Sequence, residues 1–243
     1  MMRLISAIKW DIFFQMKYGL YTAGAVLTLV WVGILSLFSG EAIRLAVPIV
    51  LLSDISTMGL LFIGSIIFFE RGQGSIAAVI TTPLKTKEYI VSKIVSLTLF
   101  ITMYSLLLTL LTSWFKGQTL NMLMLFIASV LIAVEYTLIG FYLSTFFKKF
   151  TDFLLPMGLV FAIMNLPIFT MFNIPALEAF DKLFYIIPST GFVKLLLGLY
   201  TPLSGLDVMY ALLYNGIVIV VLFKLCIKNF NTKIIGRSAD LDD

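Results

Sequence analysis

Four polar side chains lie inside long apolar runs, where they are the residues best placed to bind a ligand or carry a proton. Asp54 and Glu135 are carboxylates within such runs, and Asn165 and Asn215 are amides within two later ones. A carboxylate at bilayer depth costs about 3 kcal/mol to insert, so it must face protein or water. Buried amides of this kind often join neighbouring helices by hydrogen bonds. The pattern therefore indicates either a polar path through a helical bundle or helix–helix hydrogen bonds.

Several kinds of chemistry are excluded by the residues that the sequence lacks. It contains no histidine and one cysteine, Cys226, so histidine-based acid–base catalysis, zinc clusters and internal disulfides are ruled out. It contains no G-x-x-x-x-G-K-[ST] motif, so it has no P-loop of its own for ATP. Neither G-x-S-x-G nor H-E-x-x-H occurs. We expect no catalytic residue, no metal and no cofactor in this chain.

The composition is that of a membrane protein. Hydrophobic residues make up 60% of the 243 residues and charged residues only 12%, whereas about 25% of a soluble domain is charged. The net charge of +4 does not indicate a nucleic-acid partner, because the basic residues lie at the ends of the apolar runs. We expect the surface of the protein to face membrane lipid.

The apolar runs predict an all-α membrane protein that forms a single transmembrane domain over 1–243. A transmembrane helix needs about 20 apolar residues, and six runs reach that length. Asp54 lies in the second run, Glu135 in the fourth, Asn165 in the fifth and Asn215 in the sixth. The predicted spans are 20–38, 46–69, 90–114, 120–146, 153–172 and 208–226.

Three further segments complete the predicted organisation. Residues 1–19 place Arg3, Lys9 and Lys17 on one helical face, which predicts an interfacial helix with Trp10 at headgroup depth. The alternative is an early start of the first span. No cleavage site follows, so we expect the first run to remain in the mature protein. Residues 173–207 predict a short helical pair in the last outer loop, with additional spans as the alternative, and 227–243 a cytosolic tail.

The distribution of positive charge predicts the topology. Thirteen lysines and arginines fall on the side of the N-terminus, of the loop after the second run and of the C-terminus, and four fall on the other side. Because positive residues are enriched in cytosolic loops, both termini are predicted to be cytosolic. Lysine outnumbers arginine by 13 to 4, which is typical of AT-rich bacterial genomes. We expect a multi-pass protein of the bacterial plasma membrane.

One stretch between the second and third runs carries the densest charge in the first two hundred residues. Its landmarks, in order, are Glu70-Arg71, Gly74-Ser75, Pro83-Leu84, Tyr89 and Lys93. This order and spacing resemble the first cytosolic loop of the ABC type-2 permeases, which are the membrane subunits of a class of ATP-driven exporters. In that family the loop is a coupling helix that rests on the ATPase subunit, which here implies a coupling helix at 75–82. The alternative is an ordinary cytosolic loop.

The resemblance implies roles for individual residues. Five residues of this stretch would couple the chain to the ATPase: Glu70, Arg71, Gly74, Ser75 and Pro83. Glu70 and Arg71 are adjacent on a helix, so they do not face one another and each needs another partner.

The resemblance also separates the four polar residues inside the spans. The second and fifth spans of such permeases line a path between two protomers, which implies that Asp54 and Asn165 lie in the substrate path. Glu135 and Asn215 are then possible structural polar residues within the membrane.

The sequence thus predicts a permease subunit that supplies half of a translocation pathway. Separate ATP-binding-cassette subunits would carry ATP and magnesium, and a second permease chain, identical or related, would complete the path. The expected cargo is amphipathic or hydrophobic, such as a drug, an antimicrobial peptide or a lipid-like molecule. The alternative is a proton-coupled carrier that uses Asp54 and Glu135. An intramembrane lipid enzyme is disfavoured, because the chain has no histidine and no clustered acidic motif.

Overall fold

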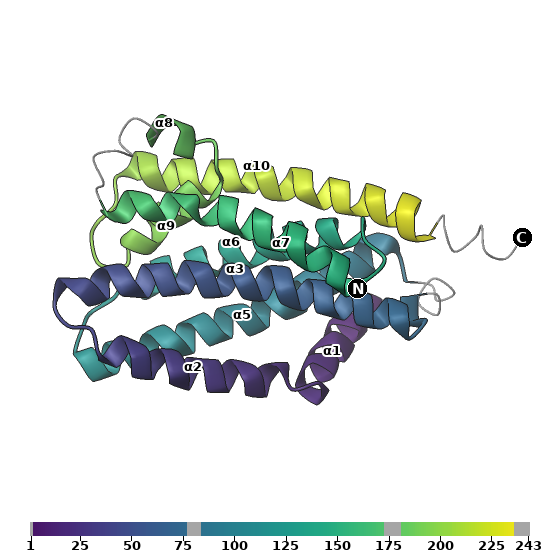
Figure 1. Ribbon diagram of the computed structural model, residues 1–243, viewed down its shortest axis with the longest axis horizontal. Helices are drawn as coiled ribbons and strands as arrows, with labels where there is room; N and C mark the ends of the chain where they lie inside the picture. Colours follow the sequence, from purple (N-terminus) through teal and green to yellow (C-terminus); the bar gives the residue numbers. More distant parts are fainter. Residues whose placement is uncertain (1, 77–83, 173–180, 236–243) are drawn as a thin grey trace, which may run out of the picture.

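The computed structural model describes residues 2–76, 84–172 and 181–235, and all regular elements within these ranges are helical. The long helices run side by side along the longest axis of the molecule (Figure 1). In chain order the elements are α1 (Met2–Lys17), α2 (Leu20–Ser36), α3 (Glu41–Gly72), α5 (Thr86–Lys116), α6 (Met122–Ser144), α7 (Phe150–Asn165), the 3₁₀ helix η1 (Leu166–Phe172), α8 (Asp181–Phe184), α9 (Ser189–Leu197), α10 (Gly205–Phe230) and the π-helical turn η3 (Asn231–Ile235).

Five helical segments of the described residues are long and apolar enough to cross a membrane. They are Glu41–Gly72, Thr86–Lys116, Met122–Ser144, Phe150–Phe172 and Gly205–Ile234. These segments coincide with five of the six predicted spans. The sixth depends on α1 and α2, which pass the same test only when they are taken together as a pair bent by 60°. With 17 residues, α2 is about 26 Å long, slightly short of a hydrocarbon core of about 30 Å.

The bend between α1 and α2 lies at Gly19, whose φ of 79° is in the left-handed region. Only glycine adopts this conformation without strain, so the chain can change direction here sharply. On α1, Trp10, Phe13 and Met16 are exposed, whereas Asp11 and Gln15 are buried. The helix therefore turns an apolar face outward and a polar face toward the bundle. Its position at a membrane interface stays a prediction.

The centre of the bundle is the contact between α3 and α6, where small residues bring two backbones together. A Cβ added at Gly59 would lie 2.9 Å from Cβ of Tyr136. A Cβ added at Gly140 would lie 2.5 Å from Cγ2 of Ile63 and 2.8 Å from the carbonyl oxygen of Leu60. Membrane helices use small residues in this way to pack closely.

We expect Gly140→Ala to destabilise the protein and Gly158→Ala to leave its stability unchanged or raise it. The first substitution places a methyl group against the backbone of α3, and overpacking of this kind costs about 1–3 kcal/mol. A Cβ at Gly158 in α7 meets no atom within 4 Å, so only the better helix propensity of alanine acts there. Thermal unfolding of both variants in detergent tests the difference. Equal melting temperatures would contradict the close approach of α3 and α6.

One end of the bundle is covered by α9, which packs against α3, α6 and α10 with most of its residues buried. The Lys194 ammonium of α9 donates to Asp207 at the start of α10 and to the Tyr185 hydroxyl at 2.7 Å. Partial burial lowers the pKa of Lys194, but these hydrogen bonds raise it above its usual value. The predicted outer loop thus contains two short helices, α8 and α9, and its residues 173–180 lie outside the described part of the chain.

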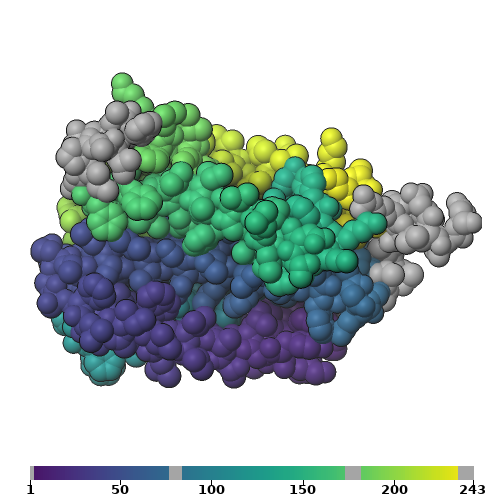
Figure 2. Space-filling model, in the orientation of Figure 1, coloured from purple at the N-terminus to yellow at the C-terminus, as the bar shows by residue number. Residues whose placement is uncertain are grey.

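One side of the bundle carries a broad exposed apolar surface. Few residues of α7 and α10 are buried, and large apolar side chains such as Leu155 and Ile217 are exposed. Figure 2 shows α7 on the outer surface of the molecule. The α-helix of α7 ends at Asn165 and continues as η1, which contains Pro167. Proline lacks an N–H and clashes with the preceding turn, so the regular α-helix ends here.

Candidate functional site

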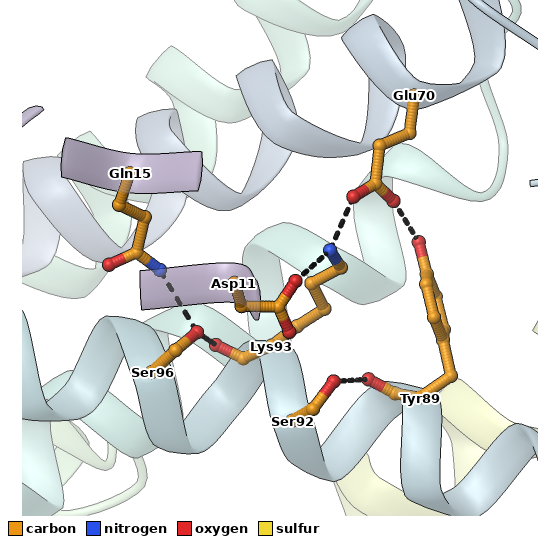
Figure 3. Close-up of polar contacts among 7 residues, drawn as sticks. All are labelled: Asp11, Gln15, Glu70, Tyr89, Ser92, Lys93 and Ser96. Carbon is orange, nitrogen blue, oxygen red and sulfur yellow. Dashed lines mark hydrogen bonds and ion pairs between the residues drawn. The ribbon is translucent and has the colours of Figure 1, made fainter. Parts of the chain in front are cut away.

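A buried ion cluster joins three helices at the end of the bundle that holds the stretch 70–93. Lys93 of α5 forms ion pairs with Asp11 of α1 and with Glu70 at the end of α3 (Figure 3). The side chain of Lys93 is only 5% exposed, and those of Asp11 and Glu70 are 8% and 12% exposed. Charges at such depth are stable only when they are paired and hydrogen-bonded. The three side chains therefore hold α1, α3 and α5 in one arrangement.

Hydrogen bonds extend the cluster along the same helices. The hydroxyl of Tyr89 donates to Glu70 at 2.6 Å, and the side-chain amide of Gln15 donates to the Ser96 hydroxyl at 2.9 Å (Figure 3). Asp11 and Gln15 are four residues apart on α1, and their partners on α5 are three apart, so each pair shares one helical face. A polar stripe of α1 thus matches a polar stripe of α5.

Arg71 points away from this cluster. Its guanidinium donates to the carbonyl oxygen of Phe147 in the connection between α6 and α7, at 2.8 Å. The same group lies 5.2 Å from the centre of the Phe68 ring. These contacts agree with the expectation that Glu70 and Arg71 have separate partners. Glu70 contacts α1 and α5, whereas Arg71 contacts the connection between α6 and α7.

The segment that follows α3 begins with a glycine in the left-handed backbone conformation. Gly74 has a φ of 68°, which lets the chain turn after the last helical residue. Ser75 and Ile76 start a new helical turn, and Ile76 is buried in the apolar cluster near Tyr89. Pro83 and residues 77–82, which make up most of the predicted coupling helix, lie outside the described residues.

A cavity of about 380 Å³ lies against the ion cluster. Four of its lining residues belong to the cluster or adjoin it, and the rest are mostly apolar. They are Arg3, Ala7, Trp10, Asp11, Phe14, Glu70, Ser75, Leu84, Tyr89, Ser92 and Lys93. This volume falls within the range of small-molecule sites, which runs from about 300 to 1,000 Å³.

Asp54 lies on a different part of α3, turned toward α2 and α5. It accepts a hydrogen bond from the Tyr104 hydroxyl at 2.6 Å. The carboxylate is half-buried. Within this chain Asp54 therefore joins α3 to α5 through a hydrogen bond.

Asn165 does not meet Asp54. Its amide donates to the backbone carbonyl of Phe161 at 2.8 Å and, at 3.4 Å, to the hydroxyl of Ser56. Positions two residues apart on a helix are separated by about 200°, so Ser56 and Asp54 lie on nearly opposite sides of α3. Asp54 and Asn165, the two residues assigned to a substrate path, thus lie on opposite sides of α3, and that role stays a prediction.

Glu135 and Asn215 are both fully buried. Among the described residues, neither carboxylate oxygen of Glu135 has a hydrogen-bond partner. The Asn215 amide donates to the carbonyl oxygen of Ala211 at 2.8 Å, and its own oxygen also has no partner among those residues. Asn215 thus bonds within its own helix. Glu135 is a carboxyl group in the bundle interior without a hydrogen-bond partner in the described part of the chain, which is costly whether or not it has a function.

Sequence reasoning did not identify Asp11 and Gln15 as site residues, because they looked like interruptions of an amphipathic pattern. It counted Lys93 among the loop charges, although the structure buries it. The sequence did contain a signal for this contact. Asp11 and Gln15 are spaced so that they share one face of a helix, and Lys93 and Ser96 share one face of another predicted helix. The sequence alone does not show which two helices pack together.

These features define the class of protein. The chain is a multi-pass membrane protein with an all-helical bundle, no P-loop in its sequence, and a buried ion cluster joining three helices at one end.

The chain belongs to the fluoroquinolones export permease protein family, whose model matches residues 2–238. It is similar to the fluoroquinolones export permease proteins of two Mycobacterium tuberculosis strains, CDC 1551 / Oshkosh and ATCC 25618 / H37Rv. It is 28% identical to each over 216 residues, which cover 88% of this chain and 89% of the relative. Permeases are transport proteins, and this membership is consistent with the resemblance to the ABC type-2 permeases.

Proposed function

We propose that this chain is the permease subunit of an ATP-driven exporter of the ATP-binding-cassette class. The relatives are named as exporters of fluoroquinolones, so we infer an amphipathic, drug-like cargo here also. One observation carries the coupling part of the proposal. The residue that closes α3, Glu70, is tied by a buried ion cluster to α1 and α5, directly before the segment 75–82.

The proposed mechanism is mechanical, with ATP and magnesium bound by a separate ATPase subunit. When two such subunits close on ATP, they move the coupling segment at 75–82. Glu70 passes this displacement through Lys93 to α5 and through Asp11 to α1, and Arg71 passes it to the connection between α6 and α7. Packed helices respond by rigid-body tilting rather than by gradual deformation. The pathway then alternates between inward- and outward-facing states.

The exposed faces of the bundle offer surface to the other proposed partners, which are membrane lipid, a second permease chain and the ATPase subunits. The apolar surface of α7 and α10 fits membrane lipid or a second permease chain, which would complete the pathway. The distribution of lysine and arginine supports the plasma-membrane topology with both termini in the cytosol. The described end with Lys85, Lys87 and Glu88 is then the cytosolic one, where the ATPase subunits would dock.

The proposal is tested by purifying the chain from native membranes and measuring ATP turnover of what comes with it. We expect a P-loop ATPase to co-purify. We expect Glu70→Ala to lower cargo-stimulated turnover about tenfold or more, because the cluster loses one of its two carboxylates. Glu41→Ala is the matched control, since Glu41 lies at the other end of the same helix and its side chain is 85% exposed. A chain that purifies alone, or a Glu70→Ala variant with unchanged turnover, would contradict the coupling role.

A second candidate function is a proton-coupled carrier that uses Asp54 and Glu135. The observation in its favour is the fully buried Glu135 carboxyl, which has no hydrogen-bond partner among the described residues. In reconstituted vesicles this carrier would transport cargo under a pH gradient without ATP. Its transport would survive Glu70→Ala and stop in Glu135→Gln.

A further inference from the structure

The exposed face of α10 carries an apolar groove. The helix lies at one edge of the bundle (Figure 1), and the groove has a volume of about 360 Å³. Gly216 leaves the middle of the groove without a side chain, and a Cβ added there would meet no atom within 4 Å. All of the lining residues belong to α10: Leu212, Leu213, Gly216, Ile217, Val220 and Val221. The larger ones are exposed, so the groove opens to the surroundings of the bundle.

Two lysines continue this face beyond the groove. Lys224 lies four residues after Val220, about 6 Å along the helix axis, and Lys228 follows about one turn later. At 100° per residue, Ile217, Lys224 and Lys228 fall within an arc of about 40°. Both lysines are exposed, and none of the salt bridges of the described residues involves them. The face therefore offers two cations that have no anionic partner in the described part of the chain.

The groove and the lysines lie at the depths of the two parts of a phospholipid. The helical segment Gly205–Ile234, which contains α10, is long and apolar enough to cross a membrane. One leaflet contributes about 15 Å of hydrocarbon, half of the usual core. Counted from Lys224, the groove runs from about 6 Å at Val220 to about 18 Å at Leu212. Because lysine side chains near a helix end extend toward the headgroups, an acyl chain in the groove brings its phosphate within reach of both lysines.

We propose that this face of α10 binds an anionic phospholipid, with one acyl chain in the groove at Gly216 and the headgroup phosphate at Lys224 and Lys228. Charge complementarity selects the lipid. A headgroup with a net negative charge gains from two unpaired cations, whereas the phosphate of a zwitterionic lipid is already matched by its own ammonium group. This binding requires neither an ATPase nor the exporter assignment.

A second copy of the chain fits this face less well than a lipid does. Two copies related by a twofold axis along the membrane normal present the same residues to each other. Lys224 and Lys228 of both copies would then meet, and like charges at short range repel. The surface of α7 has no such obstacle, because it contains neither lysine nor arginine between Phe150 and Asn165. A second permease chain is therefore better accommodated there.

The test titrates lipid onto the delipidated full chain in detergent and counts the bound lipids by native mass spectrometry. The probes are phosphatidylglycerol and phosphatidylcholine with the same two acyl chains, which differ only in the headgroup. We expect saturable binding of phosphatidylglycerol, at least about tenfold tighter than that of phosphatidylcholine, because two lysines act on the net charge. Glycerol phosphate has the charge without the chains and should not compete. Equal affinities for the two lipids, or full competition by glycerol phosphate, would overturn the proposal.

A double variant tests the headgroup contact. Lys224→Gln combined with Lys228→Gln should bring phosphatidylglycerol to the affinity of phosphatidylcholine. The matched control is Lys148→Gln combined with Lys149→Gln, which removes the same charge from exposed lysines in the connection between α6 and α7. That connection contacts α10 through Asn229, which is turned about 100° from Lys228. A control that weakens binding as much would show attraction by overall charge and overturn the site.

A substitution at Gly216 tests the acyl-chain contact. Gly216→Leu fills the groove from a position where a Cβ meets nothing, so it should weaken phosphatidylglycerol binding about tenfold without lowering the melting temperature. Gly158→Leu on α7 is the control, since that glycine is equally open. Unchanged binding in Gly216→Leu would overturn the proposal. A shift from dimer to monomer with unchanged lipid binding would also overturn it and identify the face as an interface between two chains.

Discussion

Lys93→Met is expected to destabilise the protein by about 3–5 kcal/mol, which is the usual cost of removing one partner from a buried ion pair. Methionine keeps the approximate length of the side chain but removes its charge. Asp11 and Glu70 would then lie close together as two desolvated carboxylates without their shared cation. The measurement is unfolding of the purified variant in mixed micelles, followed by the loss of helical signal as the denaturing detergent is increased.

The companion variant removes all three charges at once. Lys93→Met combined with Asp11→Asn and Glu70→Gln leaves no uncompensated charge, so it should recover much of the lost stability. Recovery would show that the loss in the single variant comes from electrostatics and not from packing. A single variant as stable as the wild type would contradict the burial of Lys93 between α1 and α3.

Replacing Glu135 is expected to raise the stability of the protein, whereas replacing Lys93 is expected to lower it. We expect Glu135→Met to raise stability by about 1–3 kcal/mol, because a fully buried carboxyl group, for which the described residues offer no hydrogen-bond partner, is replaced by an apolar side chain of similar length. Glu135→Gln is the matched control, since it keeps a polar group in the same place and should gain less. Unfolding in the same micelle system tests both variants.

A loss of stability in Glu135→Met would show that the carboxyl group has a partner in the folded protein. A gain in stability would show that Glu135 destabilises the folded protein. Cargo uptake into vesicles then distinguishes the two proposed functions. The exporter hypothesis predicts ATP-driven transport in both Glu135 variants. The hypothesis of a proton-coupled carrier predicts no transport in either variant.

Most of the helical layout follows from apolar run length, and the differences from it have local causes. The run 90–114 is extended to Thr86–Lys116 because the backbone N–H of Lys85 is capped by Glu88 at 2.9 Å. Gly117, with a φ of 62°, ends the same helix. The first span is the exception. The sequence places the boundary between the first two helices at residues 19 and 20, where the structure has it. The 17 residues of α2, however, are long enough to cross a membrane only when α1 is taken with them as a pair bent by 60°.

The site was harder to anticipate, because a sequence shows which residues share a helical face but not what covers that face. Asp11 is a polar residue within an apolar segment, so from the sequence it looks like an interruption of the amphipathic pattern. Only the fold shows that Lys93 pairs with it. The resemblance to the ABC type-2 permeases assigns Asp54 and Asn165 to a substrate path, because it places the second and fifth spans there. Their contacts with Tyr104 and Ser56 depend on the rotation of α3, which the fold determines through close packing at Gly59.

The last turn of α3 is anchored by two consecutive residues that point in different directions. Glu70 is bound toward α1 and α5, and Arg71 is bound to the backbone at Phe147. Adjacent residues on a helix project about 100° apart, so rotation of α3 about its own axis would lengthen at least one of these contacts. The helix end is therefore stiff in torsion and can respond to a push only by tilting or sliding. In the proposed exporter, a helix end with this property would transmit the direction of an applied force as well as its size.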